Sequence, residues 1–207
     1  MAYTLGFIFA DGAIIDARSS SRTCYITICC NDKDLLEQIK KFMNSNHPLQ
    51  KREPRITPFN NKPYFCKESY RIRIGSKIMY YDLIERGVIP NKSLTMRLPE
   101  IPIEYFSFFL RGYFEGDGCL SLYFPKDKMI PRIRIIFTSG SYAYLNQLVK
   151  SLSNILNTTK GAIFTKNKSN WLRFSKYDSL KILNYMYKDL YLAPFLERKY
   201  KKYLSII

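Results

Sequence analysis

Histidine is almost absent from this sequence, since His47 is the only one among 207 residues. A single imidazole excludes active sites built on several histidines and argues against a structural zinc site. The five cysteines are odd in number, and no two of them form a Cys-x-x-Cys pair. Free thiols in a reducing, intracellular compartment are therefore expected, whether bacterial cytoplasm or organelle.

Acidic residues and long apolar runs are also scarce. Asp and Glu total 17 against 33 Lys and Arg, which gives a net charge of +16. No apolar run reaches the roughly 20 residues needed to cross a bilayer, and the N-terminus lacks the pattern of a signal peptide. With 46% hydrophobic residues, the chain is expected to fold. So large a positive charge destabilises a compact monomer and is typical of proteins with a polyanionic partner, nucleic acid before an anionic membrane surface.

An apolar, helix-like segment that ends in Asp-Gly occurs twice. Tyr3–Gly12 reads YTLGFIFADG, and Phe106–Gly118 reads FSFFLRGYFEGDG. Alignment on the closing pair places four residues of one copy against four of the other: Gly6 against Gly112, Ala10 against Gly116, Asp11 against Asp117 and Gly12 against Gly118. The spacing is about half the chain, so the sequence indicates an internal duplication.

The pattern of elements supports two equivalent units, 1–100 and 101–207, with a proline-rich connection at 86–102. Helical periodicity predicts helices over 3–10, 32–43, 76–85, 104–116, 141–155, 177–187 and 192–204. Alternation predicts strands over 13–18, 23–30, 49–57, 67–74, 118–124, 131–138, 160–166 and 170–175, with a polar loop after 57. The expected fold is α+β: two αββαββα halves, each with a four-stranded antiparallel sheet whose outer face is basic.

The two Asp-Gly helices are expected to pack together at the centre of the molecule. Small residues one turn apart, at Gly6 and Ala10 and at Gly112 and Gly116, let two helix backbones approach closely. Asp11 and Asp117 would then lie within a few ångströms of each other, at the negative ends of both helix dipoles. A single Asp-Gly pair is more often only a turn, but a repeated pair of repelling carboxylates is typical of a divalent-cation site. With a phosphate polyanion as the partner, this site predicts metal-assisted hydrolysis of phosphodiesters.

In length, small positions and closing Asp-Gly, the two motifs resemble those of the LAGLIDADG homing endonucleases in their single-chain, two-motif form. The sixth position of that signature is usually acidic; it is Glu115 in the second copy and Phe9 in the first. The resemblance implies a monomeric nuclease that lays both sheets along the major groove of a long duplex target. It implies cleavage of both strands with Mg²⁺ (or Ca²⁺ or Mn²⁺ in the same sites), leaving short 3′ overhangs, and places Ala10 and Gly116 with the two aspartates in the metal site.

The same resemblance implies basic residues that assist near the scissile phosphates. Lys92 follows Asp11 at nearly the same spacing as Lys199 follows Asp117, so these two lysines are expected to activate water or stabilise transition-state charge, although either one alone reads as an ordinary surface lysine. Base readout is expected from the outward strand positions and their turns. In the first half these are Ala17, Ser19, Arg22, Tyr25, Thr27, Lys51, Arg52, Lys67, Ser69, Arg71 and Arg73; in the second half they are Ser121, Tyr123, Lys126, Arg132, Arg134, Lys166, Lys168, Trp171 and Arg173. Because the two sets differ, an asymmetric target is expected.

Other functions remain open on the same scaffold. An RNA maturase that assists intron splicing, or a DNA- or RNA-binding protein without catalysis, would share the charge and the fold. Retention of both aspartates favours the nuclease, because a pure binder has no use for a repelling pair. A membrane-surface protein is disfavoured, because no basic amphipathic helix of sufficient strength is present.

Overall fold

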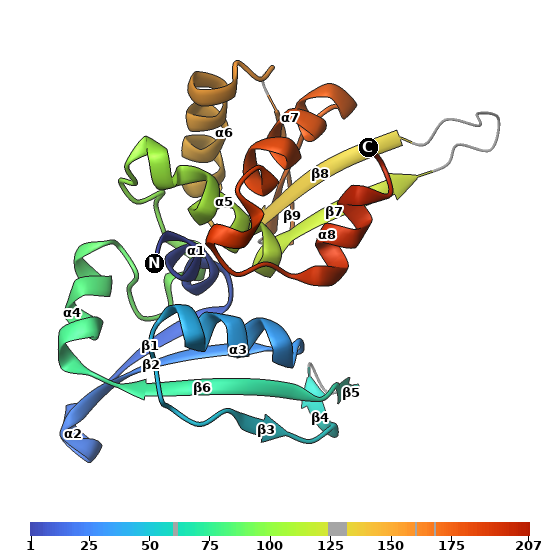
Figure 1. The fold of residues 1–207 in the computed structure, drawn as a ribbon. Helices are drawn as coiled ribbons and strands as arrows, with labels where there is room; N and C mark the ends of the chain where they lie inside the picture. The colour runs from blue at the N-terminus through green and yellow to red at the C-terminus, as the bar shows by residue number, and fades with distance from the viewer. Residues whose placement is uncertain (60–61, 124–131, 160, 168) are drawn as a thin grey trace.

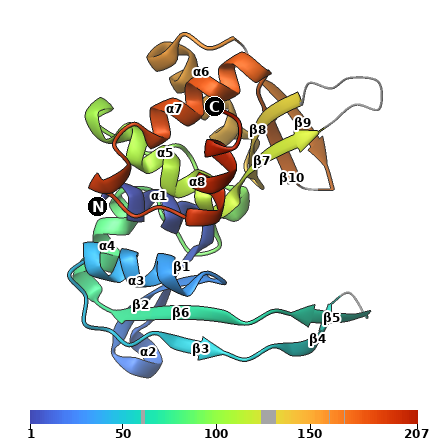
Figure 2. The same ribbon diagram turned by 45° about the vertical axis from the view of Figure 1, so that its right-hand side comes forward.

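Two four-stranded antiparallel sheets, with helices packed between and around them, form the computed structural model of this chain (Figure 1). The structure describes residues 1–59, 62–123, 132–159, 161–167 and 169–207. The expected α+β class, with one four-stranded antiparallel sheet per half, is confirmed. Helices α1 and α5 lie between the two sheets, at the centre of the molecule (Figures 1 and 2).

Both halves share the order αββαββα, apart from α2, β4 and β5 in the first half and α8 at the end of the second. The first half contains α1 (Ala2–Asp11), β1 (Gly12–Ala17), α2 (Arg18–Ser21), β2 (Thr23–Cys30), α3 (Lys33–Phe42), β3 (Gln50–Arg52), β4 (Arg55–Phe59), β5 (Lys62–Cys66), β6 (Ser69–Gly75) and α4 (Lys77–Glu85). A 3₁₀ turn, η1 (Lys92–Leu94), lies in the connection. The second half contains α5 (Ile103–Asp117), β7 (Gly118–Tyr123), β8 (Arg132–Ser139), α6 (Tyr142–Leu156), β9 (Ala162–Lys166), β10 (Ser169–Arg173), α7 (Lys176–Tyr187), η2 (Leu190–Leu192) and α8 (Glu197–Leu204).

The two sheets share one topology. Their strand orders are β1-β2-β6-β3 and β7-β8-β10-β9, so corresponding strands occupy corresponding places. In β8, Ile133, Ile135 and Phe137 are buried while the alternate side chains are more accessible. Buried Ile26 and Ile28 of β2 repeat this alternation in the first sheet. The period-2 pattern therefore assigned the core side of both sheets correctly.

The segment that follows β3 differs from its expectation. A single strand over 49–57 and then a loop were predicted, whereas β3 stops at Arg52 and a second, two-stranded sheet forms from β4 and β5. Pro54 separates β3 from β4, because proline has no N–H for the ladder. Pro58 and Pro63 lie in the stretch that was predicted as a polar loop, yet they pair with each other across the hairpin, which continues beyond the ends of β3 and β6 (Figure 2).

Helices α1 and α5 pack through their glycines. A Cβ at Gly6 would overlap the carbonyl oxygen of Phe109, and a Cβ at Gly112 would overlap the carbonyl oxygen of Tyr3. Phe109 and Tyr3 are themselves aligned residues of the two motif copies, so the contact repeats about a local twofold axis. The approach of the backbones is closer than any side chain would allow, which fixes the relative position of the two helix ends.

Both motif helices pass directly into strands at Gly12 and Gly118. These glycines have extended backbones, with φ of −90° and −94°, so the left-handed conformation does not explain them. A Cβ at Gly12 would instead lie 2.6 Å from the Cα of Ile8, and one at Gly118 would lie 2.5 Å from the Phe114 carbonyl oxygen. The sharp change from helix to strand therefore needs glycine for space, and it leaves each aspartate as the last helical residue.

Candidate active site at the ends of the motif helices

Asp11 and Asp117 end α1 and α5 where the two helices meet. A Cβ built on Gly116 would lie 3.1 Å from Oδ2 of Asp11, so the Asp11 carboxylate lies against the residue that precedes Asp117. Glycine at 116 and alanine at 10 leave room for this approach. By residue surface area Asp11 is exposed and Asp117 is partly buried, so both can meet a ligand, although surrounding protein atoms keep much of the solvent away from the Asp11 carboxyl group.

Each aspartate is destabilised in its charged form. Withdrawal from water, and after it the charge of Asp11, raise the pKa of Asp117 to about 6 against the opposing effects of Lys92 and Lys199. Withdrawal from water also raises the pKa of Asp11, which the same two lysines oppose. Both carboxylates lie at the negative ends of helix dipoles. The pair is therefore arranged for a cation that would compensate its charge.

Lys92 and Lys199, predicted as assisting residues, are both brought to this place. Each is buried, with exposed fractions of 6% and 9%. The ammonium of Lys92 donates to the carbonyl oxygen of Gly12, and that of Lys199 donates to the carbonyl oxygen of Gly118 at 2.6 Å. Gly12 and Gly118 are aligned residues, so the two lysines occupy equivalent positions about the local twofold axis.

The two lysines differ in the number of hydrogen bonds that their ammonium groups donate. Lys199 also donates to the carbonyl oxygens of Phe114 at 2.7 Å and Glu115 at 2.9 Å, so all three of its N–H groups bind the end of α5. Burial lowers the pKa of Lys199 to about 8, and the nearby Glu115 carboxylate partly offsets this. Burial also lowers the pKa of Lys92, opposed by Asp117 and Asp11. In this arrangement Lys199 caps a helix terminus that would otherwise expose unpaired carbonyls.

A hard divalent cation fits the oxygen atoms at this site. The carbonyl oxygens of Ala10 and Gly116 lie next to the two carboxylates in the chain. Within the described part of the chain they accept no hydrogen bond from a side chain, a helix cap or a loop, so they are available as ligands. Within that same part, no three His, Cys, Asp or Glu side chains gather as a metal site. Two carboxylates are nevertheless sufficient for Mg²⁺, which keeps several waters and completes its coordination with substrate phosphates. The predicted set of Asp11, Asp117, Ala10 and Gly116 is therefore compatible with Mg²⁺.

Glu115 lies outside this site. It is only 2% exposed and accepts hydrogen bonds from the Tyr3 hydroxyl, the Tyr187 hydroxyl at 3.1 Å and the Leu196 N–H at 2.9 Å. Burial raises its pKa, and Tyr3 and Leu196 oppose the rise most strongly. The side chain therefore fastens α5 to α1, to α7 and to the segment that leads into α8.

Arg111 was missed from the sequence and reinforces the same attachment. It is fully buried, and its guanidinium donates to the carbonyl oxygens of Met186, Leu190 and Ala193 at 3.1–3.2 Å. Burial lowers its pKa, and Glu115 opposes this most strongly. The sequence did contain a signal for this role, because Arg111 lies one helical turn before Glu115 in an otherwise apolar helix. A cation on a buried apolar face requires buried hydrogen-bond acceptors.

The first sheet places most of its predicted contact residues on its outer face. Ladder register puts Tyr25, Thr27, Arg52, Ser69, Arg71 and Arg73 on the side opposite the core. Ser19 and Arg22 are exposed at the β1–β2 connection, and Lys67 is exposed between β5 and β6. Ala17 has the outer register but is buried, and Lys51 has the opposite register and binds Glu53 and Glu68 at 2.9 Å. Ile15 and Gln50 share the outer face and were missed.

The second sheet repeats this arrangement. Its outer register contains Ser121, Tyr123, Arg132, Arg134, Lys166, Trp171 and Arg173. Lys126 and Lys168 lie outside the described residues. Phe164 and Thr138 share this face but were not predicted as contact residues. Both are paired with Trp171, Phe164 on the neighbouring strand β9 and Thr138 on the neighbouring strand β8. Both sheets thus present rows of arginines between aromatic and small side chains.

Several of these arginines are already held by neighbours on the same face. The Arg73 guanidinium stacks 3.8 Å from the centre of the Tyr25 ring, and that of Arg173 lies 4.4 Å from the centre of the Phe164 ring. Arg71 donates to the side-chain oxygen of Gln50. Such contacts reduce the side-chain entropy that a bound partner would have to remove, while leaving the charges at the surface.

Comparisons with known proteins agree with the motifs. Residues 110–207 match the model of the LAGLIDADG endonuclease family. No sequence among the curated proteins matches. The meganuclease I-SmaMI bound to uncleavable DNA has a similar structure, with a TM-score of 0.62 at 16% identity over 98% of this chain and 87% of that chain. Mesophilic variants of the homing endonuclease I-DmoI give 0.60 at 18% identity over 94% and 93%.

The same fold also occurs in a protein that is not named as a nuclease. Full-length DUF199/WhiA from Thermatoga maritima gives a TM-score of 0.55 at 19% identity, over 99% of this chain and 58% of that chain. At these identities the structures show a shared fold. Together with the family model, they confirm the resemblance to the single-chain, two-motif LAGLIDADG homing endonucleases. No helix in the described ranges is long and apolar enough to cross a membrane.

Proposed function

We propose that this chain is a metal-dependent DNA endonuclease of the homing type, which hydrolyses one phosphodiester in each strand of a long, asymmetric duplex target. The observation that carries the proposal is the meeting of Asp11 and Asp117 at two helix ends, with a buried lysine beside each. Because one chain supplies both carboxylates, it would act as a monomer, with units 1–100 and 101–207 each facing one half of the target.

At the site, the protein's part would be to hold ions and charge in place. Asp11 and Asp117, with the carbonyls of Ala10 and Gly116, would hold Mg²⁺. Bound Mg²⁺ supplies an activated water and stabilises the charge that develops on the leaving oxygen. Lys92 and Lys199 would add positive charge near both phosphates while keeping the helix ends rigid.

Recognition would come from the outer faces of the two sheets. A net charge of +16 and the rows of arginines on both faces suit a phosphate backbone. The predicted contact residues with outer register, Arg71 and Arg73 in one half and Arg132, Arg134 and Arg173 in the other, can donate to guanine edges in the major groove. Cleavage across the narrow minor groove by two adjacent sites would leave short 3′ overhangs.

The proposal is tested by selecting cleaved molecules from a randomised duplex library in the presence of Mg²⁺. A defined, asymmetric site with 3′ overhangs is expected for the wild type, and none for Asp11→Asn or Asp117→Asn. Both variants should still bind the selected site, with an affinity that falls steeply with salt. Wild-type cleavage rates in either variant would show that the carboxylates are misassigned.

The second candidate is a nucleic-acid binder on the same scaffold, either an RNA maturase or a protein without catalysis. It is favoured by one observation, the shared fold with DUF199/WhiA. Failure to enrich any cleaved sequence, combined with tight, salt-dependent binding to duplex DNA or to a structured intron RNA, would select this function instead.

A further inference from the structure

The β4–β5 hairpin continues the β3–β6 pair in one unbroken register. Gln50 is opposite Arg71 and Arg52 is opposite Ser69 in the sheet. Beyond the interruption at Pro54, Ile56 is opposite Phe65. Each step forward on one strand is still one step back on the other, so no bulge intervenes. Residues at even positions before the turn thus keep the register of the outer, arginine-bearing face.

That register leaves one face of the hairpin apolar. Ile56, Pro58, Pro63 and Phe65, which we call the apolar face, share one side. The hydroxyl of Thr57 and the thiol of Cys66 are 3.3 Å apart on the other side, which fixes the assignment of the two faces independently. Ile56 is 71% exposed and Phe65 is 60% exposed, and both prolines are exposed as well.

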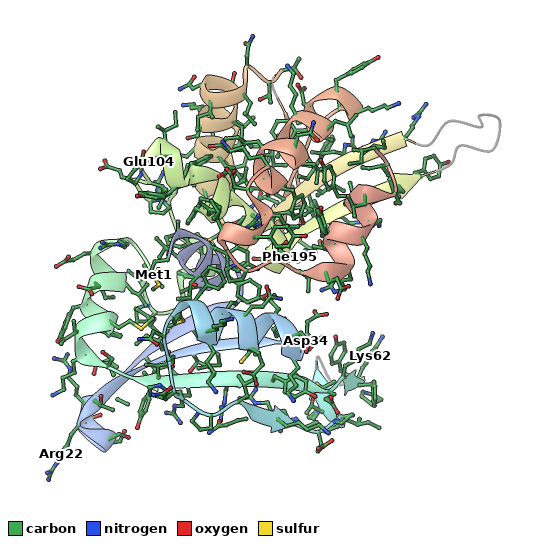
Figure 3. All side chains as sticks on the ribbon, in the orientation of Figure 1. Met1, Arg22, Asp34, Lys62, Glu104 and Phe195 are labelled. Atoms are coloured by element: carbon green, nitrogen blue, oxygen red, sulfur yellow. The ribbon has the colours of Figure 1, made fainter. Side chains whose placement is uncertain are left out.

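Among the residues that the structure describes, none covers this face enough to bury Ile56 or Phe65. The hairpin projects past the edge of the helical layer, and Lys62 lies at its far end, opposite the end that carries Arg22 (Figure 3). A two-stranded ribbon with an uncovered apolar side is marginal in water on its own. The second half has no counterpart among its described residues, since its hairpin consists of the short strands β9 and β10 alone. The extension therefore distinguishes the two halves.

The surroundings of the apolar face indicate which partner covers it. Arg52 and Lys67 are exposed and continue the register of the apolar face at its inner end, and Arg55 and Lys62 are exposed on the other face of the same ribbon, so positive charge lies beside the apolar strip. A two-stranded ribbon fits the major groove of duplex DNA, where the thymine methyl is the apolar group presented by a base edge. From Arg52 to Pro58 the strand extends about 20 Å at about 3.3 Å per residue, which spans about six base pairs.

We propose that the apolar face lies in the major groove beyond the end of the first sheet and reads thymine methyl groups at the outer end of one half-site. The inference rests on the proposed binding of duplex DNA and specifies a contact that the outer faces of the sheets do not make. It also predicts a longer footprint on the side of the first half than on the side of the second.

The test compares wild type with the double variant Ile56→Ser/Phe65→Ser, which removes the apolar side-chain groups from both strands. Target selection with wild type should enrich thymine at outer positions of one half-site, and the variant should lose only that preference. Replacing those thymines by deoxyuracil removes the methyls and should weaken wild-type binding about fourfold per contacted methyl. The variant should be insensitive to the replacement. A matched control, Ile78→Ser/Tyr177→Ser, changes exposed apolar side chains on helices α4 and α7 and should behave as wild type.

Three outcomes would overturn the inference and leave the nuclease proposal standing. These are equal footprints on both sides of the cleavage site, equal sensitivity of wild type and variant to deoxyuracil, and a hairpin-dependent dimer in light scattering without DNA. The last would make the apolar face a contact between copies. Absence of duplex binding in every variant and in wild type would instead contradict the proposed function itself.

Discussion

Asp117→Asn is expected to make the protein more stable while abolishing cleavage. Asp117 has a pKa of about 6 in the folded protein against an ordinary value of 3.8, chiefly because it is withdrawn from water and faces Asp11. A shift of this size corresponds to about 3 kcal/mol at most, and screening of a partly buried group reduces it to about 2 kcal/mol. Asparagine has the same shape without the charge, so the variant should gain about that much at pH 8.

The gain should depend on pH with a definite sign. The folded protein binds the Asp117 proton more tightly than the unfolded chain does, so this group's contribution to stability is complete below about pH 4. It is lost as pH rises through about 6, the pKa in the folded state. The stability difference between Asp117→Asn and wild type should therefore be near zero at pH 4, grow between pH 4 and pH 6, and stay constant above that.

Urea unfolding across this pH range, without divalent ions, measures the difference directly. Asp82→Asn on the exposed side of α4 is the control and should change stability by less than about 0.5 kcal/mol at any pH. Saturating Mg²⁺ should stabilise the wild type and leave Asp117→Asn unchanged, because only the intact pair binds the ion. A variant that is no more stable than wild type at pH 8, or a gain that does not vary with pH, would refute the reasoning.

Two further pairs of substitutions test how the motif helices pack and how their ends are capped. Gly112→Ala should lower the free energy of unfolding by about 3 kcal/mol, because the new methyl would overlap the Tyr3 carbonyl oxygen, whereas Gly75→Ala, whose methyl would make ordinary contacts, should change it little; urea unfolding decides this. Lys199→Met should cost more stability than Lys92→Met, because it removes three hydrogen bonds to backbone carbonyls and not one, each worth about 1 kcal/mol; equal costs in the same assay would contradict the capping role.

The centre of the molecule was predictable because the sequence there is constrained in two ways at once. Gly6 and Gly112 mark the seam by their spacing, and the Asp-Gly pairs mark its end. Alternation in β2 and β8 separated core from surface, since a side chain on a strand has only two directions. Both signals are local, and the duplication made each of them visible twice.

The features that could not be predicted from the sequence depend on contacts between distant segments. The β4–β5 hairpin was read as a loop because Pro58 and Pro63 remove ladder donors, and only their mutual pairing shows that the ribbon continues. The lysine pair was found by symmetry, but its attachment to Gly12 and Gly118 carbonyls was not, because helix termini carry no mark of which side chain will satisfy them.

Substitutions at the sixth signature position can test whether the acidic residue there, Glu115, has a structural or a catalytic role. Glu115 accepts three hydrogen bonds inside the core, while Phe9 packs edge-on against Phe109 with ring centres 5.6 Å apart. In Glu115→Gln the amide oxygen can accept from the Tyr3 hydroxyl and the Leu196 N–H, but the NH2 group then faces the Tyr187 hydroxyl and the hydrogen bonds lose the negative charge of their acceptor, which should cost about 2 kcal/mol of stability. Tyr3→Phe removes one of those donors, so the double variant should lose less than the two single losses combined.

Phe9→Leu serves as the control and should combine additively with Tyr3→Phe, because Phe9 makes no hydrogen bond in that network. The Mg²⁺ concentration needed for half-maximal cleavage should be the same in Glu115→Gln as in wild type, since the carboxylate faces Tyr187 and Leu196 and not the pair of aspartates. An altered Mg²⁺ requirement would assign Glu115 to the metal site. An unchanged requirement together with coupling to Tyr3 would assign it to the attachment of α5, and would explain why one copy of the motif can carry phenylalanine there while both keep the terminal aspartate.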